Sequence, residues 1–219
     1  MNCIVTAGPT YEPLDEVRRL TNFSTGRLGT ELATFLAARG HQVTLLLGVQ
    51  ATHRAETPAT IQLFTTTADL AAKLKAFSDH KVDAIFHASA VSDFAFGKLF
   101  MRSADGNLEP FVPSKKISTR QGNLMVELMP TPKILAQLRG WFPRAQIIGW
   151  KFEADGGRAD ALQAAQRQIT ECATNACVAN GPAYGRGFGL VTAAGQQHYS
   201  DPKELYAALQ RLLVGPDIS

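Results

Sequence analysis

The fold of this chain is decided by one stretch of its sequence, Thr6-Ala-Gly-Pro-Thr-Tyr-Glu-Pro-Leu-Asp-Glu-Val-Arg-Arg-Leu-Thr-Asn-Phe-Ser-Thr-Gly-Arg-Leu-Gly29. The stretch begins at the end of a short apolar run, Asn2 to Ala7, which predicts a buried strand. It ends where the residues from Leu28 to Ala38 take up the apolar spacing of a helix. A strand joined to a helix by a polar, glycine-containing loop is where many α/β proteins bind phosphate groups.

The start of the predicted helix is suited to an anion. Ser24 or Thr25 can serve as the N-cap, and the first N–H groups of a helix have no partner within it. Gly26 and Gly29 let a phosphate and the neighbouring strand come close. Turn glycines and a capped helix without any ligand would give the same pattern, so this feature alone does not decide the function.

The loop matches neither of the common nucleotide-binding motifs. A compact G-x-G-x-x-G would hold its glycines within six residues, whereas Gly8 and Gly26 are far apart. The pattern G-x-x-x-x-G-K-[ST] also fails, because Arg27 follows Gly26 where that motif requires lysine.

Composition excludes several classes of protein. Of the 219 residues 45% are hydrophobic, and no apolar run approaches the roughly 20 residues of a membrane span. The net charge is only +3 and the basic residues are scattered, so nucleic acid is not indicated as a partner. No targeting segment precedes the first strand, so we expect a cytoplasmic protein. The histidines and cysteines show no metal-ligand spacing, and metal ligands stay unknown.

Strand and helix patterns alternate along most of the chain. This alternation predicts an α/β fold with a mostly parallel sheet and helices on both faces, in one domain over residues 1–219. The predicted strands are Asn2 to Ala7, Gln42 to Leu47, Thr60 to Phe64, Asp83 to Ala88, Ala145 to Lys151 and Asn175 to Ala179, and the predicted helices are Arg27 to Arg39, Asp69 to Phe77, Pro132 to Trp141 and Arg158 to Cys172.

Two segments depart from the alternation. Residues from Phe94 to Met129 contain turn clusters at Asp105-Gly106-Asn107 and Gln121-Gly122-Asn123, which predict an antiparallel ribbon. Residues 190–200 predict a C-terminal hairpin, followed by a helix that begins at Asp201 with Pro202 at its first turn.

Several polar segments follow predicted strands. They come after Ala7, Ala88, Gly149 and Ala179. Because ligands of parallel sheets bind beyond the carboxyl ends of the strands, we expect these segments to converge on one cleft.

The segments also resemble a known family, the phosphopantothenoylcysteine synthetases, whose domain has a Rossmann-like fold. The resemblance is carried, in order along nearly the whole chain, by the opening stretch with Thr21-Asn22-Phe23-Ser24-Thr25-Gly26, by Ala88-Ser-Ala-Val-Ser-Asp-Phe94, by Pro113-Ser-Lys-Lys-Ile117, by Gly149-Trp-Lys-Phe-Glu153 and by Val178-Ala-Asn180.

The resemblance implies a ligase of coenzyme A biosynthesis. Such an enzyme joins 4′-phosphopantothenate and cysteine through an acyl nucleotidylate formed from CTP or ATP, with Mg²⁺ accompanying the triphosphate. No flavin is expected, since the decarboxylase domain fused to many bacterial relatives has no counterpart in this sequence. The resemblance also implies a homodimer built on the ribbon.

The family motifs imply roles for individual residues. Asn22 would hold the acyl nucleotidylate, Arg18 would bind a substrate carboxylate or phosphate, and Lys116 would neutralise phosphate charge during activation. Without the resemblance, Asn22 reads as a turn residue and the two cations as solvated surface charges. The residues implied to bind the nucleotide are Gly8, Thr10, Ser24, Thr25, Gly26, Ser89, Asp93, Trp150 and Asn180.

Some positions depart from the family pattern. Relatives often carry lysines after the isoleucine of the lysine motif, where this chain has Ser118 and Thr119, and Lys115 is then the candidate for a second charge. CTP-using relatives carry further lysines where this chain has Gln168 and Cys172. A diverged nucleotide-binding protein without ligase activity therefore stays an alternative, as does a dinucleotide-dependent reductase, which the missing compact fingerprint disfavours.

Overall fold

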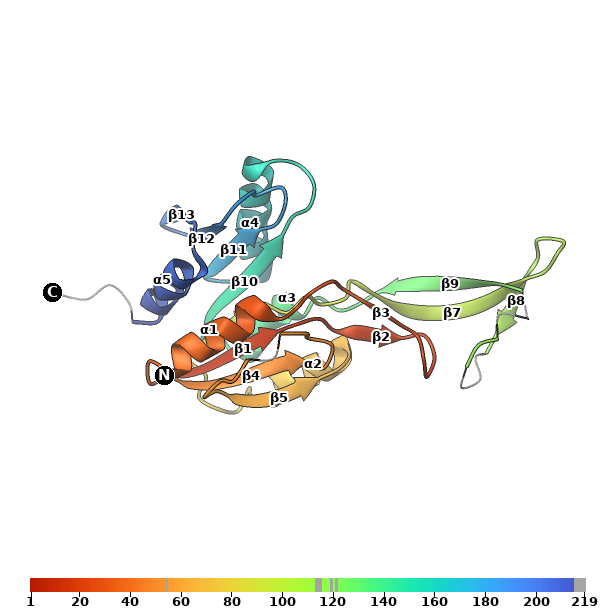
Figure 1. The fold of residues 1–219 in the computed structure, drawn as a ribbon, viewed down its shortest axis with the longest axis horizontal. Helices are drawn as coiled ribbons and strands as arrows, with labels where there is room; N and C mark the ends of the chain where they lie inside the picture. Colours follow the sequence, from red (N-terminus) through yellow and green to blue (C-terminus); the bar gives the residue numbers. More distant parts are fainter. Residues whose placement is uncertain (54, 113–115, 119, 121, 215–219) are drawn as a thin grey trace.

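The computed structural model describes residues 1–53, 55–112, 116–118, 120 and 122–214, and an eight-stranded sheet forms its centre (Figure 1). The strand order is β13-β12-β11-β10-β6-β1-β4-β5. The mutually parallel strands are β1 (Asn2–Ala7), β4 (Gln42–Gly48), β5 (Thr60–Phe64), β6 (Ala84–His87), β10 (Gln146–Phe152) and β11 (Ala176–Asn180), and the antiparallel strands are β12 (Phe188–Thr192) and β13 (Gly195–Tyr199).

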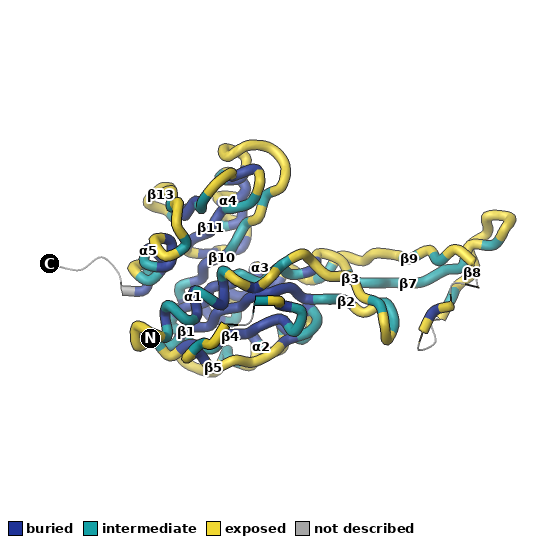
Figure 2. Tube along the Cα trace, viewed as in Figure 1, coloured by how far each residue is buried: buried dark blue, intermediate teal, exposed yellow. Residues whose placement is uncertain are grey.

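Helices cover both faces of the sheet, as the alternation predicts. On one face lie α1 (Arg27–Ala37) and α5 (Pro202–Val214), and on the other lie α2 (Thr67–Lys75), α3 (Ile134–Trp141) and α4 (Arg158–Cys172). Along β1, Val5 and Ala7 pack into the core under α1, while Ile4 packs under α2 and α3. Strands buried on both sides read as continuous apolar runs, and Figure 2 shows them as the buried interior.

The topology has a switch point between β1 and β6. From β1 the chain moves outward through β4 to β5, returns to β6 on the opposite side of β1, and then continues outward through β10 to β11. This strand order is that of dinucleotide-binding α/β folds, in which ligands bind beyond the carboxyl ends of the strands at the switch point. The predicted parallel strands agree with the observed ones to within one residue at each end.

The loop between β1 and α1 differs from expectation in two ways. It contains a small antiparallel hairpin, β2 (Tyr11–Pro13) and β3 (Arg19–Thr21), which the sequence patterns do not predict. The expected cap of α1 by Ser24 or Thr25 is wrong, because the N-cap is Gly26, whose φ of 79° is left-handed. Thr25 lies one residue too early, although its Oγ1 accepts a hydrogen bond from Arg27 N at 3.3 Å.

The antiparallel ribbon is confirmed. It consists of β7 (Phe94–Arg102), β8 (Leu108–Phe111) and β9 (Asn123–Pro130) in the order β8-β7-β9, and it projects away from the central sheet in Figure 1. The predicted turn at Asp105-Gly106-Asn107 is present, with Gly106 at a φ of 87°. Of the second predicted turn, Gln121 lies outside the described residues.

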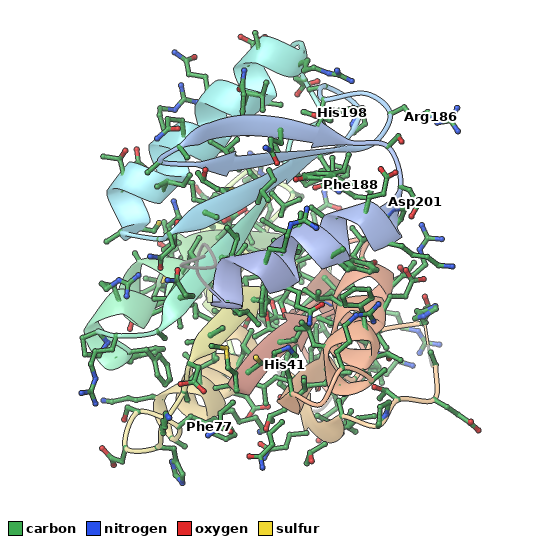
Figure 3. The ribbon with its side chains drawn as sticks, turned by 90° about the vertical axis from the view of Figure 1, so that its left-hand side faces the viewer. His41, Phe77, Arg186, Phe188, His198 and Asp201 are labelled. Carbon is green, nitrogen blue, oxygen red and sulfur yellow. The ribbon has the colours of Figure 1, made fainter. Side chains whose placement is uncertain are left out.

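The C-terminal hairpin and helix are also present. Strands β12 and β13 pair antiparallel at the edge of the sheet, and α5 packs against both of them and against α1. In the view of Figure 3, α5 lies below this hairpin, with Phe188, His198 and Asp201 on the same side of the molecule. Asp201 Oδ1 accepts a hydrogen bond from Lys203 N at 2.6 Å, which starts the helix. In the described part of the chain, no helix combines the length and apolar character that crossing a membrane requires.

A buried histidine lies where the central strands end. His87, the last residue of β6, is only 6% exposed, and its Nδ1 lies 3.0 Å from Thr6 Oγ1. The same hydroxyl accepts a hydrogen bond from Ser89 N at 3.2 Å. Burial lowers the pKa of His87 to about 4, so the imidazole is neutral at neutral pH.

We therefore expect acid to destabilise the protein through His87. The pKa of a histidine in an unfolded chain is about 6.5, so between that value and about 4 the unfolded state binds the extra proton. The free energy of unfolding should fall by about 2 kcal/mol between about pH 7.5 and about pH 5. Urea unfolding at both pH values measures the change. In the variant His87→Asn the free energy of unfolding should fall by less over the same pH range, and an equal fall would exclude His87 as the cause.

Candidate functional site at the carboxyl edge of the sheet

The β1–α1 loop (residues 8–26) is fixed to the body of the protein through its hairpin. Tyr11 N donates to Thr65 O at 3.1 Å. Glu12, only 9% exposed, accepts a hydrogen bond on Oε1 from Thr67 N at 3.0 Å, at the first residue of α2. A carboxylate is favourable there, because the helix dipole is positive at its N-terminus. Glu12 therefore anchors the loop and is not free to bind a ligand.

Glycines at the two ends of this loop allow a tight backbone approach. Gly8 and Gly26 have left-handed φ angles of 80° and 79°. A Cβ at Gly8 would lie 2.8 Å from Ala51 Cβ, and one at Gly26 would lie 3.0 Å from the same atom. Only glycine fits at these positions without displacing the loop after β4. The close approach places the N-terminus of α1 beside the end of β1.

The β1–α1 loop is joined to the β6–β7 loop (residues 88–93) across the switch point. Ala90 N donates to Gly8 O and Thr10 N donates to Ala90 O, both at 3.1 Å. Ser92 N donates to Thr10 Oγ1 at 2.8 Å. The Thr10 hydroxyl is fully buried and also lies 3.2 Å from Thr67 Oγ1, so it is engaged within the protein.

Asn22 faces the same junction. Its Nδ2 donates to Val91 O at 3.0 Å, while the residue itself is exposed. Among the described residues, its Oδ1 and its second amide N–H make no hydrogen bond, so they are available to a ligand. The turn interpretation of Asn22 also describes part of its role, since its backbone O accepts from Ser24 N at 3.0 Å.

The other predicted nucleotide-binding residues lie along the same edge. Asp93 is exposed at the end of the β6–β7 loop, and its backbone O accepts from Thr131 N at 2.9 Å. Trp150 on β10 packs partly buried against the core shared by α1 and α5. Asn180 ends the neighbouring strand β11, where its O accepts from Glu153 N at 2.9 Å.

Several polar atoms at this edge are buried without a hydrogen-bond partner among the described residues. They are the hydroxyl oxygens of Ser89 and Ser92 and Nε1 of Trp150. Buried polar groups are costly when unpaired, and a bound ligand or water is a common explanation. A ligand near these atoms would have hydroxyl and indole groups within reach.

A buried carboxylate links Arg18 to the lysine segment (residues 116–118). Asp15 Oδ2 accepts from Arg18 Nε at 3.0 Å, from Arg18 Nη2 at 2.5 Å and from Ile117 N at 3.1 Å. Arg18 Nη2 also donates to Ile117 O at 2.7 Å. The side chain of Asp15 has no exposed surface, and these hydrogen bonds, led by that of Arg18, hold its pKa well below the usual range.

Sequence reasoning gave Asp15 no role, although its position three residues before Arg18 within the matched motif is a signal of pairing. Sequence reasoning gave no role to Lys151 either. Its Nζ lies 3.1 Å from Glu153 Oε1, and the pair lies on β10 and just beyond it, beside Trp150. Lys116 is exposed and lies one residue before the buried Ile117. The predicted second cation Lys115 and the departure at Thr119 lie outside the described residues.

No cluster of three or more histidine, cysteine, aspartate or glutamate side chains suited to a metal is present in residues 1–53, 55–112, 116–118, 120 and 122–214. The two departures on α4 are both buried. Gln168 Nε2 lies 3.1 Å from Cys177 Sγ and 3.4 Å from Trp150 O, and Cys172 packs in the core beneath α3. Both positions therefore belong to the interior in this chain.

Fold and site together define an α/β protein of the Rossmann-like class, with its polar loops gathered at the switch point. The chain belongs to the family of the DNA/pantothenate metabolism flavoprotein C-terminal domain, whose model matches residues 1–204. The family resemblance that the motifs carry is thus confirmed.

Individual relatives agree with this assignment. The chain is 30% identical over 177 residues to the coenzyme A biosynthesis bifunctional protein CoaBC of Thermococcus kodakarensis, covering 81% of this chain and 40% of that protein. The chain thus spans less than half the length of this relative.

Solved structures share the fold. A DNA/pantothenate metabolism flavoprotein from Streptococcus pneumoniae superposes with a TM-score of 0.83 at 24% identity, over 98% of both chains. A Cab2 variant in complex with phosphopantothenate-cysteine gives a TM-score of 0.72 at 19% identity, over 97% of this chain and 87% of that one.

The predicted close approach of α1 to the neighbouring strand is confirmed at Gly29. A Cβ at this position would lie 2.6 Å from Ala7 Cβ and 3.0 Å from Thr6 O. Gly140 in α3 serves as a control, since it is also a helical glycine but a Cβ there would meet nothing within 4 Å.

The two glycines should respond to alanine in opposite directions. Gly29→Ala should lower the free energy of unfolding by about 1–3 kcal/mol, because the added methyl group forces α1 away from β1. Gly140→Ala should raise it by about 0.5–1 kcal/mol, because alanine favours helix. Urea unfolding of both variants measures the difference. Similar changes in the two variants would show that the contact with Ala7 does not limit the packing.

Proposed function

We propose that this chain is a phosphopantothenate–cysteine ligase that acts in coenzyme A biosynthesis and uses CTP or ATP. The observation that carries the proposal is the position of the Asn22 amide. Its Nδ2 donates to Val91 O at 3.0 Å across the switch point, and the other polar atoms of the amide have no partner among the described residues. The family membership and the phosphopantothenate-cysteine complex of the Cab2 neighbour support the same substrates.

In the proposed reaction the protein positions two anions and stabilises charge. The N–H groups in the first turn of α1 would bind a phosphate, and the left-handed turn at the N-cap Gly26 is what lets the chain enter the helix there. The Asn22 amide would donate to the carbonyl oxygen of the acyl nucleotidylate as cysteine attacks. Lys116 and Arg18 would compensate phosphate and carboxylate charge in the first step. The reaction requires no covalent enzyme intermediate.

Mg²⁺ is proposed to arrive with the triphosphate. The described residues place no group of three potential ligands together, so phosphate oxygens and water would supply most of its coordination. When bound, the ion would neutralise part of the triphosphate charge. The ligase chemistry has no step for a flavin, and an absorbance spectrum of the purified protein tests the prediction that none is bound.

The alternative of a diverged binding protein receives no added support from the α4 departures. Gln168 and Cys172 are buried, so the side chains at these two positions contribute to the packing of the interior. A dinucleotide-dependent reductase remains disfavoured by the wide separation of Gly8 and Gly26.

One assay tests the proposed function. The purified chain is incubated with Mg²⁺, 4′-phosphopantothenate, cysteine and either CTP or ATP, while pyrophosphate and the thiol product are both measured. Product with one nucleotide confirms the ligase and identifies its co-substrate. Neither pyrophosphate nor product, with nucleotide binding intact, would favour the diverged binding protein.

The second step should depend on Asn22. In Asn22→Ala we expect pyrophosphate release to continue while the thiol product falls by about 100-fold, because the amide that stabilises the developing oxyanion is lost. Asn107→Ala, in the exposed turn of the ribbon, is the matched control and should leave both signals unchanged. Normal product formation by Asn22→Ala would remove this residue from the mechanism.

We also propose that the chain forms a homodimer through its ribbon. The ribbon exposes large apolar side chains, with Phe94 at 45%, Met125 at 40%, Leu128 at 48% and Met129 at 52% exposure. A concentration of exposed large apolar side chains on one element is typical of a protein–protein interface.

Sedimentation equilibrium should give twice the 23.7 kDa mass of the chain. Leu128→Lys should shift the protein to monomer, because a charge would be buried unpaired in the interface. Asp105→Lys, at the exposed turn of the ribbon, should remain dimeric. A monomeric wild-type protein would contradict the proposal.

A further inference from the structure

Asp15 is the point at which two distant parts of the chain meet. Its carboxylate accepts hydrogen bonds from the backbone of its own loop, from Val17 N at 3.0 Å and from Arg18 N at 2.8 Å. The other oxygen receives the Arg18 side chain and the backbone N of Ile117, which is 102 residues away in sequence. The carboxylate is thus hydrogen-bonded on both oxygens and has no exposed surface.

Ile117 is held on both sides of its Cα atom. Its N–H donates to Asp15 at 3.1 Å, and its carbonyl oxygen accepts from Arg18 Nη2 at 2.7 Å. Its side chain is buried, with 4% exposure. The N–H of Ile117 belongs to the peptide group that begins at Lys116, so fixing this group fixes the backbone from which the lysine side chain extends.

The same carboxylate also orders the loop that carries Asn22. Leu14 N donates to Arg18 O at 2.8 Å, which closes the turn around Asp15. Strand β3 follows directly, and Thr21 Oγ1 then donates to Thr10 O at 2.8 Å immediately before Asn22. Asp15 is therefore hydrogen-bonded to the residue that follows Lys116, and it lies in the turn that leads through β3 to Asn22.

We propose that Asp15 is the positioning residue of the site: it sets the Arg18 guanidinium and holds the backbone of Lys116 against the β1–α1 loop. The inference rests on the proposed ligase function for its catalytic consequence, but its structural part stands independently. Charge-assisted hydrogen bonds are among the strongest in proteins, and loss of the carboxylate would leave the N–H of the buried Ile117 without its partner and the half-exposed Arg18 guanidinium without its carboxylate.

The variant Asp15→Asn separates this role from general stability. An amide has the size of the carboxylate, but its nitrogen is a donor. Because both Asp15 oxygens accept only from N–H groups, the amide nitrogen would face donors in either orientation, and the charge that holds Arg18 would be lost. Glu16→Gln is the matched control, since Glu16 is the neighbouring acid and is exposed. Asp15→Glu keeps the charge at a longer reach and serves as a second variant, should the asparagine variant fail to fold.

The first measurement needs no substrate. Amide hydrogen exchange followed by NMR should show Ile117 exchanging at least about 10-fold faster in Asp15→Asn, while buried amides of β1 such as Val5 keep their protection. The control Glu16→Gln should match the wild type. Unchanged exchange at Ile117 would overturn the proposal whether or not the chain is a ligase.

The second measurement tests the catalytic consequence. Asp15→Asn should lower the rate of the pyrophosphate-releasing step by about 100-fold, since small misplacements of a catalytic group have effects of this size. In the Lys116→Ala background the same change should cost much less, because the positioned group is already absent. Equal losses in both backgrounds would contradict positioning of Lys116. A wild-type chain without ligase activity would refute the proposed function and leave the exchange result to decide the role of Asp15.

Discussion

The site depends on the hydrogen bonds that join the two loops at the switch point. Ala90 N to Gly8 O and Thr10 N to Ala90 O, each at 3.1 Å, extend the pairing of β1 and β6 beyond the ends of both strands. Parallel strands diverge after their last residues unless the following loops are also paired. Here the pairing continues, so the amide of Asn22 reaches Val91 O and the loop that begins α1 keeps a defined position. The left-handed turns at the two loop glycines make this backbone path possible.

Much of this architecture follows from the sequence, because the central strands are buried on both faces and the helices have clear apolar spacing. β1 and α4 agree with their predicted bounds, and the strand ends place the matched motifs on one edge. The hairpin of β2 and β3 could not be predicted, because its strands are only three residues long, β2 includes Pro13 and β3 is fully exposed. The cap of α1 was misplaced, because the sequence shows hydroxyl residues but not the left-handed turn at Gly26.

The site residues likewise include some whose position follows from the sequence and some whose contacts do not. The sequence places Asn22 and Asp93 on loops at the correct edge, since loop position follows from strand order. It does not show that Glu12 is engaged at the start of α2, or that Asp15 reaches the lysine segment, because both contacts join residues far apart in sequence. Contacts between distant segments depend on side-chain geometry that no local pattern encodes.

The charges at this edge are held in fixed positions by partners within the protein. Arg18 is paired with Asp15, and Lys151 with Glu153 at 3.1 Å. A cation that is already oriented loses little side-chain entropy when an anionic ligand binds, although the ligand must then share it with a carboxylate. Net charge is therefore a poor guide to this site, because pairing and position determine how much positive potential a ligand meets. The proposed magnesium-bound triphosphate would suit this arrangement, because it would bring its own counterion and could bind through the backbone N–H groups at the start of α1.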